Sequence, residues 1–110
     1  MNFLPLQSEE QLAKIKEAEG YSIIFKHNTT CPISKGVKGR LEQDGDELSE
    51  KAPVYIVDLI ANRPMSDAVA EEFDVKHQSP QLLVIKNGEC TYDEALYAIT
   101  VEDTANAIAE

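Results

Sequence analysis

The sequence has no long run of apolar residues. Its longest apolar stretches are Leu82–Ile85 and Ile23–Phe25, far shorter than the roughly 20 residues that cross a bilayer. The first residues, Met1–Leu6, carry no basic region and no long apolar segment, so they do not have the pattern of a secretory signal peptide. We therefore expect a cytoplasmic protein with no membrane partner.

Positive charge is also scarce. The chain has 10 Lys and Arg residues against 20 Asp and Glu, which gives a formal net charge of −10. The basic residues are scattered, whereas nucleic acids and other phosphate-rich partners require clustered cations. We therefore expect no nucleic-acid partner.

Only two cysteines are present, Cys31 and Cys90. Such a pair in a cytosolic chain is seldom a structural disulfide, and the spacing of a zinc site does not occur, so no metal is expected. With 110 residues, 43% of them hydrophobic, and no repeat or linker, the chain is expected to form a single domain over residues 1–110. Because no helix pattern leaves an apolar face exposed, we expect a monomer.

The period of the apolar residues changes along the chain and predicts alternating helices and strands. Ser8–Gln11 has the pattern of a capping box at a helix start, and Gly20 ends that helix. Asn87-Gly88 favours a two-residue hairpin turn. The predicted helices follow Ser8, Cys31, Arg63 and Thr100; the predicted strands are 21–27, 54–57, 81–86 and 89–92; residues 48–52 are expected to form a polar connection.

This order combines a β-α-β unit, which gives a parallel strand pair, with an antiparallel hairpin. The expected fold class is therefore α/β, with a central four-stranded mixed sheet flanked by helices. That arrangement is thioredoxin-like.

Cys31 has the strongest chemical signal in the chain. It follows a predicted strand and precedes a helix that begins at Pro32, so the free amides of Ile33 and Ser34 can face the sulfur. Cysteine reacts as the thiolate, and the positive end of a helix dipole favours that form. The polar Thr30 before it favours an exposed turn over the alternative, a small apolar residue in the core.

Ser34 stands where a dithiol oxidoreductase has its second cysteine. Its hydroxyl could hydrogen-bond a Cys31 thiolate but cannot form a disulfide, so the motif is monothiol. A mixed disulfide on Cys31 must then be resolved by another molecule's thiol, or by Cys90 if that residue is near. We expect Cys90 to be structural instead, on the same face of the hairpin strand as Tyr92 and far from the reactive helix end.

The pair Ser79-Pro80 completes the predicted site. A proline after a polar loop and directly before a strand suits the cis-proline that thioredoxin-like folds place opposite the cysteine, and an ordinary trans proline is the alternative. The backbone before such a proline can pair with an extended disulfide partner. His27 and His77 could act as general bases or be ordinary strand-end and loop residues.

Two segments resemble those of a known family. Residues 26–34, Lys-His-Asn-Thr-Thr-Cys-Pro-Ile-Ser, resemble the active-site segment of the YtxJ family, the monothiol bacilliredoxins of bacteria, and His77-Gln78-Ser79-Pro80-Gln81 is similar to its second hallmark. The resemblance covers most of residues 8–110 and includes Asp58, Arg63, Ser66, Ala70, Asn87-Gly88 and Ile99-Thr100. One departure is Ala95-Leu96, where we expect a Ser-His pair in this family.

The resemblance implies a thiol–disulfide oxidoreductase that removes bacillithiol from S-bacillithiolated proteins. Cys31 would attack the mixed disulfide and take bacillithiol onto itself, and Ser34 would leave the adduct for a second low-molecular-weight thiol. No bound cofactor is expected, bacillithiol or a similar thiol is the co-substrate, and S-thiolated cytosolic proteins are the partners. The predicted substrate-binding residues are Thr30, Pro32, Ile33, Ser34, Ser79 and Pro80.

Two other functions stay open on the sequence alone. Monothiol glutaredoxins, which carry iron–sulfur clusters, also have a serine three residues after a single cysteine, although they have glycine where Pro32 stands. A thioredoxin-fold adaptor with an idle cysteine would need no exchange chemistry.

Overall fold

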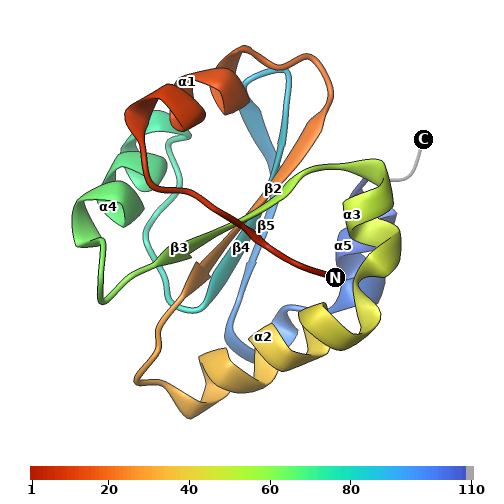
Figure 1. Ribbon diagram of the computed structural model, residues 1–110. Coiled ribbons are helices and arrows are strands. Elements are labelled where there is room, and N and C mark those ends of the chain that lie inside the picture. The colour runs from red at the N-terminus through yellow and green to blue at the C-terminus, as the bar shows by residue number, and fades with distance from the viewer. Residues whose placement is uncertain (109–110) are drawn as a thin grey trace.

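The computed structural model describes residues 1–108, and its centre is a five-stranded sheet in the order β1-β3-β2-β4-β5 (Figure 1). The first three strands of that order run parallel to one another, and the last two continue the sheet antiparallel. The strands are β1 (Leu4–Pro5), β2 (Tyr21–His27), β3 (Val54–Asp58), β4 (Gln81–Lys86) and β5 (Glu89–Ala95). The predicted α/β, thioredoxin-like architecture is confirmed.

Helices cover both faces of the sheet, which gives three layers (Figure 1). One hydrophobic cluster packs α2 (Pro32–Asp44), α3 (Asp46–Lys51) and α5 (Val101–Ala107) against one face. A second cluster packs α1 (Glu9–Glu17) and α4 (Arg63–Glu72) against the other. A short 3-10 turn, η1 (Leu96–Ala98), joins β5 to α5. Within residues 1–108, no helix has the length and apolarity needed to cross a membrane.

Side chains of the central strand β2 alternate between the two faces, as a strand requires. Ile23 and Phe25 belong to the cluster under α2, whereas Ile24 belongs to the cluster under α4. His27 continues the first row, with its ring stacked on that of Phe25 at 5.9 Å. Lys26 continues the second row, so the end of β2 presents a histidine on one face and a lysine on the other.

Two elements correct the sequence prediction. The sheet has five strands and not four, because Leu4 and Pro5 pair with Tyr55 and Ile56 of β3 as a short edge strand. An edge position tolerates proline, which has no N–H to donate. Residues 48–52 are not simply a connection, since α3 reaches Lys51 and buries Leu48 completely.

A β-bulge corrects the expected position of Cys90. The register of β5 shifts between Val84 and Ile85, so that Tyr92 lies opposite Val84 and Cys90 lies opposite Ile85. The extra residue, Thr91, breaks the alternation. Tyr92 therefore packs with the cluster under α2 and Cys90 with the cluster under α4, and they do not share a face.

Candidate active site

Cys31 is the N-cap residue of α2, and Pro32 is the first residue of that helix. The N–H of Cys31 donates to the carbonyl of Asn28 at 3.1 Å, and its carbonyl accepts the N–H of Lys35 at 3.1 Å. The thiol is half-buried and makes no capping hydrogen bond. A partly exposed sulfur thus lies at a helix start whose first amides are free, as the sequence predicts.

Asn28 organises the turn that leads to Cys31. Its Oδ1 accepts the N–H of Thr30 at 2.9 Å and the hydroxyl of Thr30 at 2.7 Å. Thr30 and Pro32 are exposed beside the cysteine, whereas Ile33 is half-buried and packs against the hydrophobic cluster under α2. Of these three predicted substrate-binding residues, only Thr30 and Pro32 stand fully at the surface.

Ser34 is fully buried and is engaged away from the sulfur. Its Oγ accepts the N–H of Asn28 at 2.9 Å and lies 2.7 Å from Nδ1 of His27. Burial lowers the pKa of His27, and the positive charge of Lys38 adds to this effect. A neutral His27 can accept the single hydroxyl proton of Ser34 at Nδ1. Ser34 therefore stabilises the turn between β2 and α2, and its hydroxyl makes no hydrogen bond to Cys31 in the structure.

The Ser79-Pro80 peptide bond is cis, as predicted. Gln81, the next residue, pairs with Lys26, so Ser79 and Pro80 lie beside the end of β2, where the chain turns toward Cys31. The Pro80 carbonyl accepts the N–H of Leu96 at 3.1 Å. The hydroxyl of Ser79 is buried and has no hydrogen-bond partner among the described residues.

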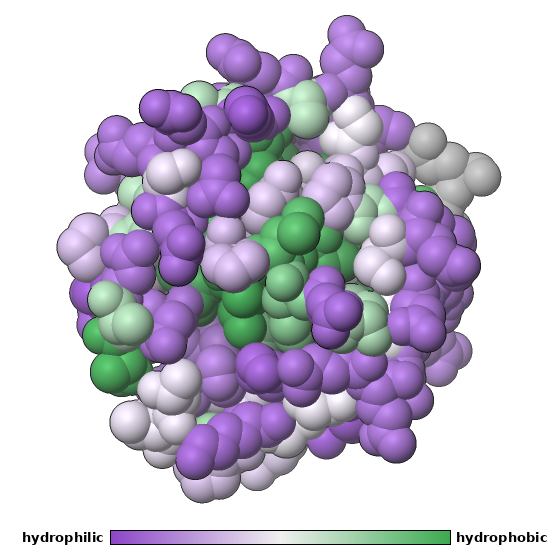
Figure 2. All heavy atoms as spheres, viewed as in Figure 1, coloured by the Kyte–Doolittle hydropathy of each residue, from purple (hydrophilic) through white to green (hydrophobic). Residues whose placement is uncertain are grey.

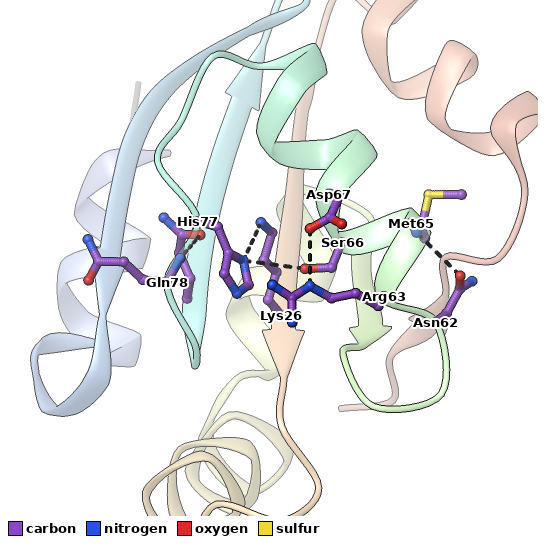
Figure 3. Close-up of polar contacts among 9 residues, drawn as sticks. Lys26, Asn62, Arg63, Met65, Ser66, Asp67, His77 and Gln78 are labelled. Carbon is purple, nitrogen blue, oxygen red and sulfur yellow. Dashed lines mark hydrogen bonds and ion pairs between the residues drawn. The ribbon is translucent and has the colours of Figure 1, made fainter.

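A basic cluster, Lys26, Arg63 and His77, lies on the α4 side of this end of the sheet (Figure 3). Nζ of Lys26 is 3.2 Å from Nδ1 of His77, and Oγ of Ser66 is 3.5 Å from the same atom. Arg63, in the first turn of α4, donates to Asp67 at 3.1 Å. His77, Arg63 and Ser66 all belong to the segments that resemble the family, but no sequence pattern predicts that they lie around a buried lysine.

Burial dominates the electrostatics of this cluster. Lys26 is 0% exposed, and this burial lowers its pKa to about 8, with Asp67 opposing the change and Arg63 adding to it. Burial also lowers the pKa of His77, and the charges of Lys26 and Arg63 lower it further. At neutral pH the cluster therefore contains a charged lysine, a charged arginine and a neutral imidazole.

Gln81 fixes the loop that carries His77 and Ser79. Its Nε2 donates to the carbonyl of Lys76 at 3.0 Å and to Oδ2 of Asp93 at 3.3 Å. Its Oε1 accepts the N–H of Gln78 at 3.2 Å. One buried amide thus joins the loop before Pro80 to strand β5.

A cleft of about 490 Å³ borders the other side of the Cys31 turn. Apolar residues of β1 and β3 form its floor, and the centre of the face in Figure 2 is correspondingly apolar within a hydrophilic surround. Its polar wall includes His27, Thr29, Lys38 and Asp58. Since Lys38 is paired with Glu42 at 3.0 Å and Asp58 is acidic, this cleft has no excess positive charge.

Cys90 lies at the opposite end of the sheet. It is level with Ile85, which pairs with Ser22 near the start of β2, whereas Cys31 follows the end of β2. Its Sγ donates to the carbonyl of Tyr92 at 3.3 Å, and burial raises the pKa of its thiol. These features are those of a structural cysteine.

The fold and the half-exposed cysteine at a helix start define a thioredoxin-like thiol protein. The chain matches the family model described as monothiol bacilliredoxin BrxC over residues 4–104, so it belongs to the monothiol bacilliredoxin family. A solved structure described as a candidate oxidoreductase with a thioredoxin fold is 30% identical, with a TM-score of 0.82 over 94% of this chain and 91% of that one. Together these likenesses support a thiol oxidoreductase.

Two more distant structures share the fold alone. The thioredoxin of Malassezia sympodialis, Mala s 13, is 18% identical with a TM-score of 0.75, over 97% of this chain and 88% of that one. The thioredoxin of Trypanosoma brucei brucei is 13% identical with a TM-score of 0.76, over 96% and 87%.

Proposed function

We propose that this protein removes bacillithiol from cytosolic S-bacillithiolated proteins, with Cys31 as the attacking thiolate. The observation that carries the proposal is the environment of Cys31: a half-exposed thiol at the N-cap of α2, with the buried Ser34 where a resolving cysteine would stand. A site with one cysteine can accept a thiol but needs a second molecule to release it.

The exchange is balanced in two steps. The Cys31 thiolate attacks the bacillithiol sulfur of the mixed disulfide; a disulfide forms between Cys31 and bacillithiol, and the protein thiolate leaves and takes a proton from water. A second low-molecular-weight thiolate then attacks the bacillithiol sulfur, which releases Cys31 and forms a disulfide between the two small thiols. Disulfide bonds are exchanged without net oxidation.

The cis-proline segment suits the protein half of the substrate. Ser79 and Pro80 lie just before β4 and beside the end of β2. The backbone of Ser79 can pair there with an extended segment around the bacillithiolated cysteine of the substrate protein. Thr30 and Pro32 would flank the sulfur from the other side. The hydroxyl of Ser79 is buried and has no hydrogen-bond partner within residues 1–108, which supports a role in binding because buried polar groups are normally hydrogen-bonded.

A single-turnover experiment tests the proposal. Reduced protein is mixed with a bacillithiolated protein of known site, and intact-mass spectrometry follows both chains. We expect bacillithiol to leave the substrate and to appear on Cys31, with Cys31→Ser inactive and Cys90→Ser as fast as the unaltered protein. Retention of bacillithiol on the substrate, or transfer that survives Cys31→Ser, would overturn the proposal.

A further inference from the structure

We infer that Arg63 and His77 form an anion subsite that binds a carboxylate of the low-molecular-weight thiol, with Lys26 behind them as the positioning residue for His77. The inference rests on the proposed function, because it concerns the thiol that Cys31 would take up. It assigns a role to a cluster that the exchange chemistry at Cys31 leaves unexplained.

The cluster carries more positive than negative charge. Lys26 is buried and has no carboxylate within ion-pair distance among residues 1–108, and the one acid beside the cluster, Asp67, is bonded to Arg63. A buried cation without a direct ion-pair partner is unfavourable, and a bound anion would offset that cost. The whole chain has a net charge of −10, which repels anions, so this local excess of positive charge is unusual in the protein.

The tautomer of His77 follows from its contact with Lys26. A lysine ammonium is only a donor, so its 3.2 Å contact makes Nδ1 of His77 the acceptor. A neutral imidazole with Nδ1 as acceptor carries its proton on Nε2. That N–H has no partner among the described residues and is not among the buried unpaired atoms, so it faces solvent as a fixed donor.

The cluster lies close enough to Cys31 for one small molecule to meet both. The hydrogen bond from Cys31 to Asn28 closes a turn, and Lys26 lies two residues before that turn. The α-carbons of Lys26 and Cys31 are therefore within about 14 Å of each other. A molecule the size of a tripeptide spans about 10 Å, and the side chains of Cys31 and of the cluster cover the remaining distance, so a small thiol bonded to Cys31 is long enough to meet the cluster drawn in Figure 3.

The cleft beside His27 differs from the basic cluster in its charge. That cleft has room for a small molecule, but its lysine is paired and its wall holds the acidic Asp58. The basic cluster has the charge to select a carboxylate, and the loop between it and Pro80 contains the unpaired Ser79 hydroxyl. The subsite is thus assigned to the α4 side of the sheet.

Two probes test the inference. One peptide is prepared as a mixed disulfide with mercaptosuccinate, which has two carboxylates, and the same peptide as a mixed disulfide with thioglycerol, which has none. Release of the peptide thiol is timed with reduced protein, and each rate is divided by the rate with free cysteine. We expect a preference of about tenfold for the mercaptosuccinate probe, since a charge-assisted hydrogen bond is worth one to two decades.

Matched variants locate the subsite. Arg63→Gln and His77→Asn are expected to slow the mercaptosuccinate reaction by about five- to tenfold and to change the thioglycerol reaction by less than about twofold. His77→Gln should retain most of the preference, because its amide nitrogen can take the place of Nε2. Lys51→Gln removes one charge at the remote, exposed end of α3 and serves as the control.

The outcomes separate the two proposals. Equal normalised rates for the two probes, or variants that slow both probes by the same factor, would overturn the subsite while leaving exchange at Cys31 intact. Failure of the unaltered protein to release peptide from either probe would instead count against the proposed function. Melting temperatures of all variants show that a loss of preference does not reflect unfolding.

Discussion

Burial of the charged Lys26 side chain lowers the stability of the fold. Its side chain is fully buried and its pKa falls from 10.5 to about 8, which corresponds to at most roughly 3 kcal/mol of unfavourable burial for the charged form. A sequence selected for stability alone would place an apolar side chain there. Local conflicts of this kind are typical of functional sites.

Lys26→Met is therefore expected to leave the free energy of unfolding at pH 7 unchanged or to raise it by about 1–3 kcal/mol. Methionine has a similar length and no charge to desolvate. The same variant should lose the preference for a carboxylated thiol, since His77 loses the donor that orients it. Urea unfolding measures the stability, and the two-probe exchange assay measures the preference.

The pH dependence of the free energy of unfolding tests whether burial of the Lys26 charge causes this loss of stability. Lys26 loses its proton near pH 8 in the folded protein, where Arg63, Asp67 and His77 face it, and near pH 10.5 in the unfolded chain. Between these values the unfolded chain binds more protons, so the native protein gains stability from this group as pH rises. The stability difference between Lys26→Met and the unaltered protein should shrink over that window; a constant difference would contradict burial of the charge as the cause.

At the scale of the element, the first turn of α2 has serine, and not a second cysteine, at position 34, so the site has one thiol. Ser34 is one helical turn from Cys31 and is held by His27 and Asn28. Its replacement therefore changes both the chemistry of the site and the bracing of the turn.

Ser34→Cys is expected to convert the site into a dithiol. Residues three apart in the first helical turn have α-carbons about 5–6 Å apart, which suits a disulfide. The introduced thiol should then release the Cys31 adduct without a second small thiol, and the protein should lose about 1–2 kcal/mol of stability with the two hydrogen bonds. Mass spectrometry after a single turnover distinguishes an internal disulfide from a persistent bacillithiol adduct.

Leu96, the second residue of the Ala95-Leu96 pair, begins the 3-10 turn η1 in an unfavourable backbone conformation. Leu96 has a φ of 57°, in the left-handed region, while its N–H is bonded to the carbonyl of Pro80. Leu96→Gly is expected to raise the free energy of unfolding by about 0.5–1 kcal/mol because it removes the steric cost of that conformation. Leu96→Val should lower the free energy of unfolding, since a branched Cβ fits the left-handed conformation poorly. Thermal unfolding measures both variants, and a valine variant more stable than the glycine variant would contradict a strained backbone at Leu96.

The sequence predicts the elements that have a strong period and misses those that lack one. The apolar runs of β2 and β4 and the Asn87-Gly88 turn are found because pattern and turn chemistry agree there. Strand β1 is missed because it has two residues and one is proline, and α3 because Leu48 is its one buried residue. No residue type in the sequence indicates the β-bulge at Thr91.

The candidate site shows the same division. Cys31 and the cis-proline are predicted from local signals, namely a helix start and a proline before a strand. The contact between Lys26 and His77 joins residues 51 positions apart. It was missed because a lysine within a buried strand gives no sign of which distant side chain it meets.

At the scale of the whole molecule, the sheet separates the two cysteines. His27 lies five residues after Ser22, which is at the level of Cys90, so the two sites are about 16 Å apart along β2 before the Cys31 turn is added. A disulfide needs α-carbons within about 7 Å. The fold thus prevents Cys90 from resolving an adduct on Cys31.

Mild oxidation of the purified protein is expected to give dimers linked through Cys31 and no internal Cys31–Cys90 bridge. Cys90→Ser should oxidise as the unaltered protein does, and Cys31→Ser should stay monomeric, because burial keeps the Cys90 thiol protonated. Non-reducing mass spectrometry of tryptic peptides identifies the linkage. Recovery of a peptide pair that joins the two cysteines within one chain would show that the ends of the sheet approach each other.

The buried amide of Gln81 has a consequence for how such a site can evolve. It bonds the loop that carries His77 and Ser79 and also Asp93 on strand β5. A substitution at the exposed Asp93 would therefore loosen or tighten this loop without altering any residue of the proposed binding sites. Descendants of this chain could adjust their choice of thiol from the edge of the sheet while the reactive end stays the same.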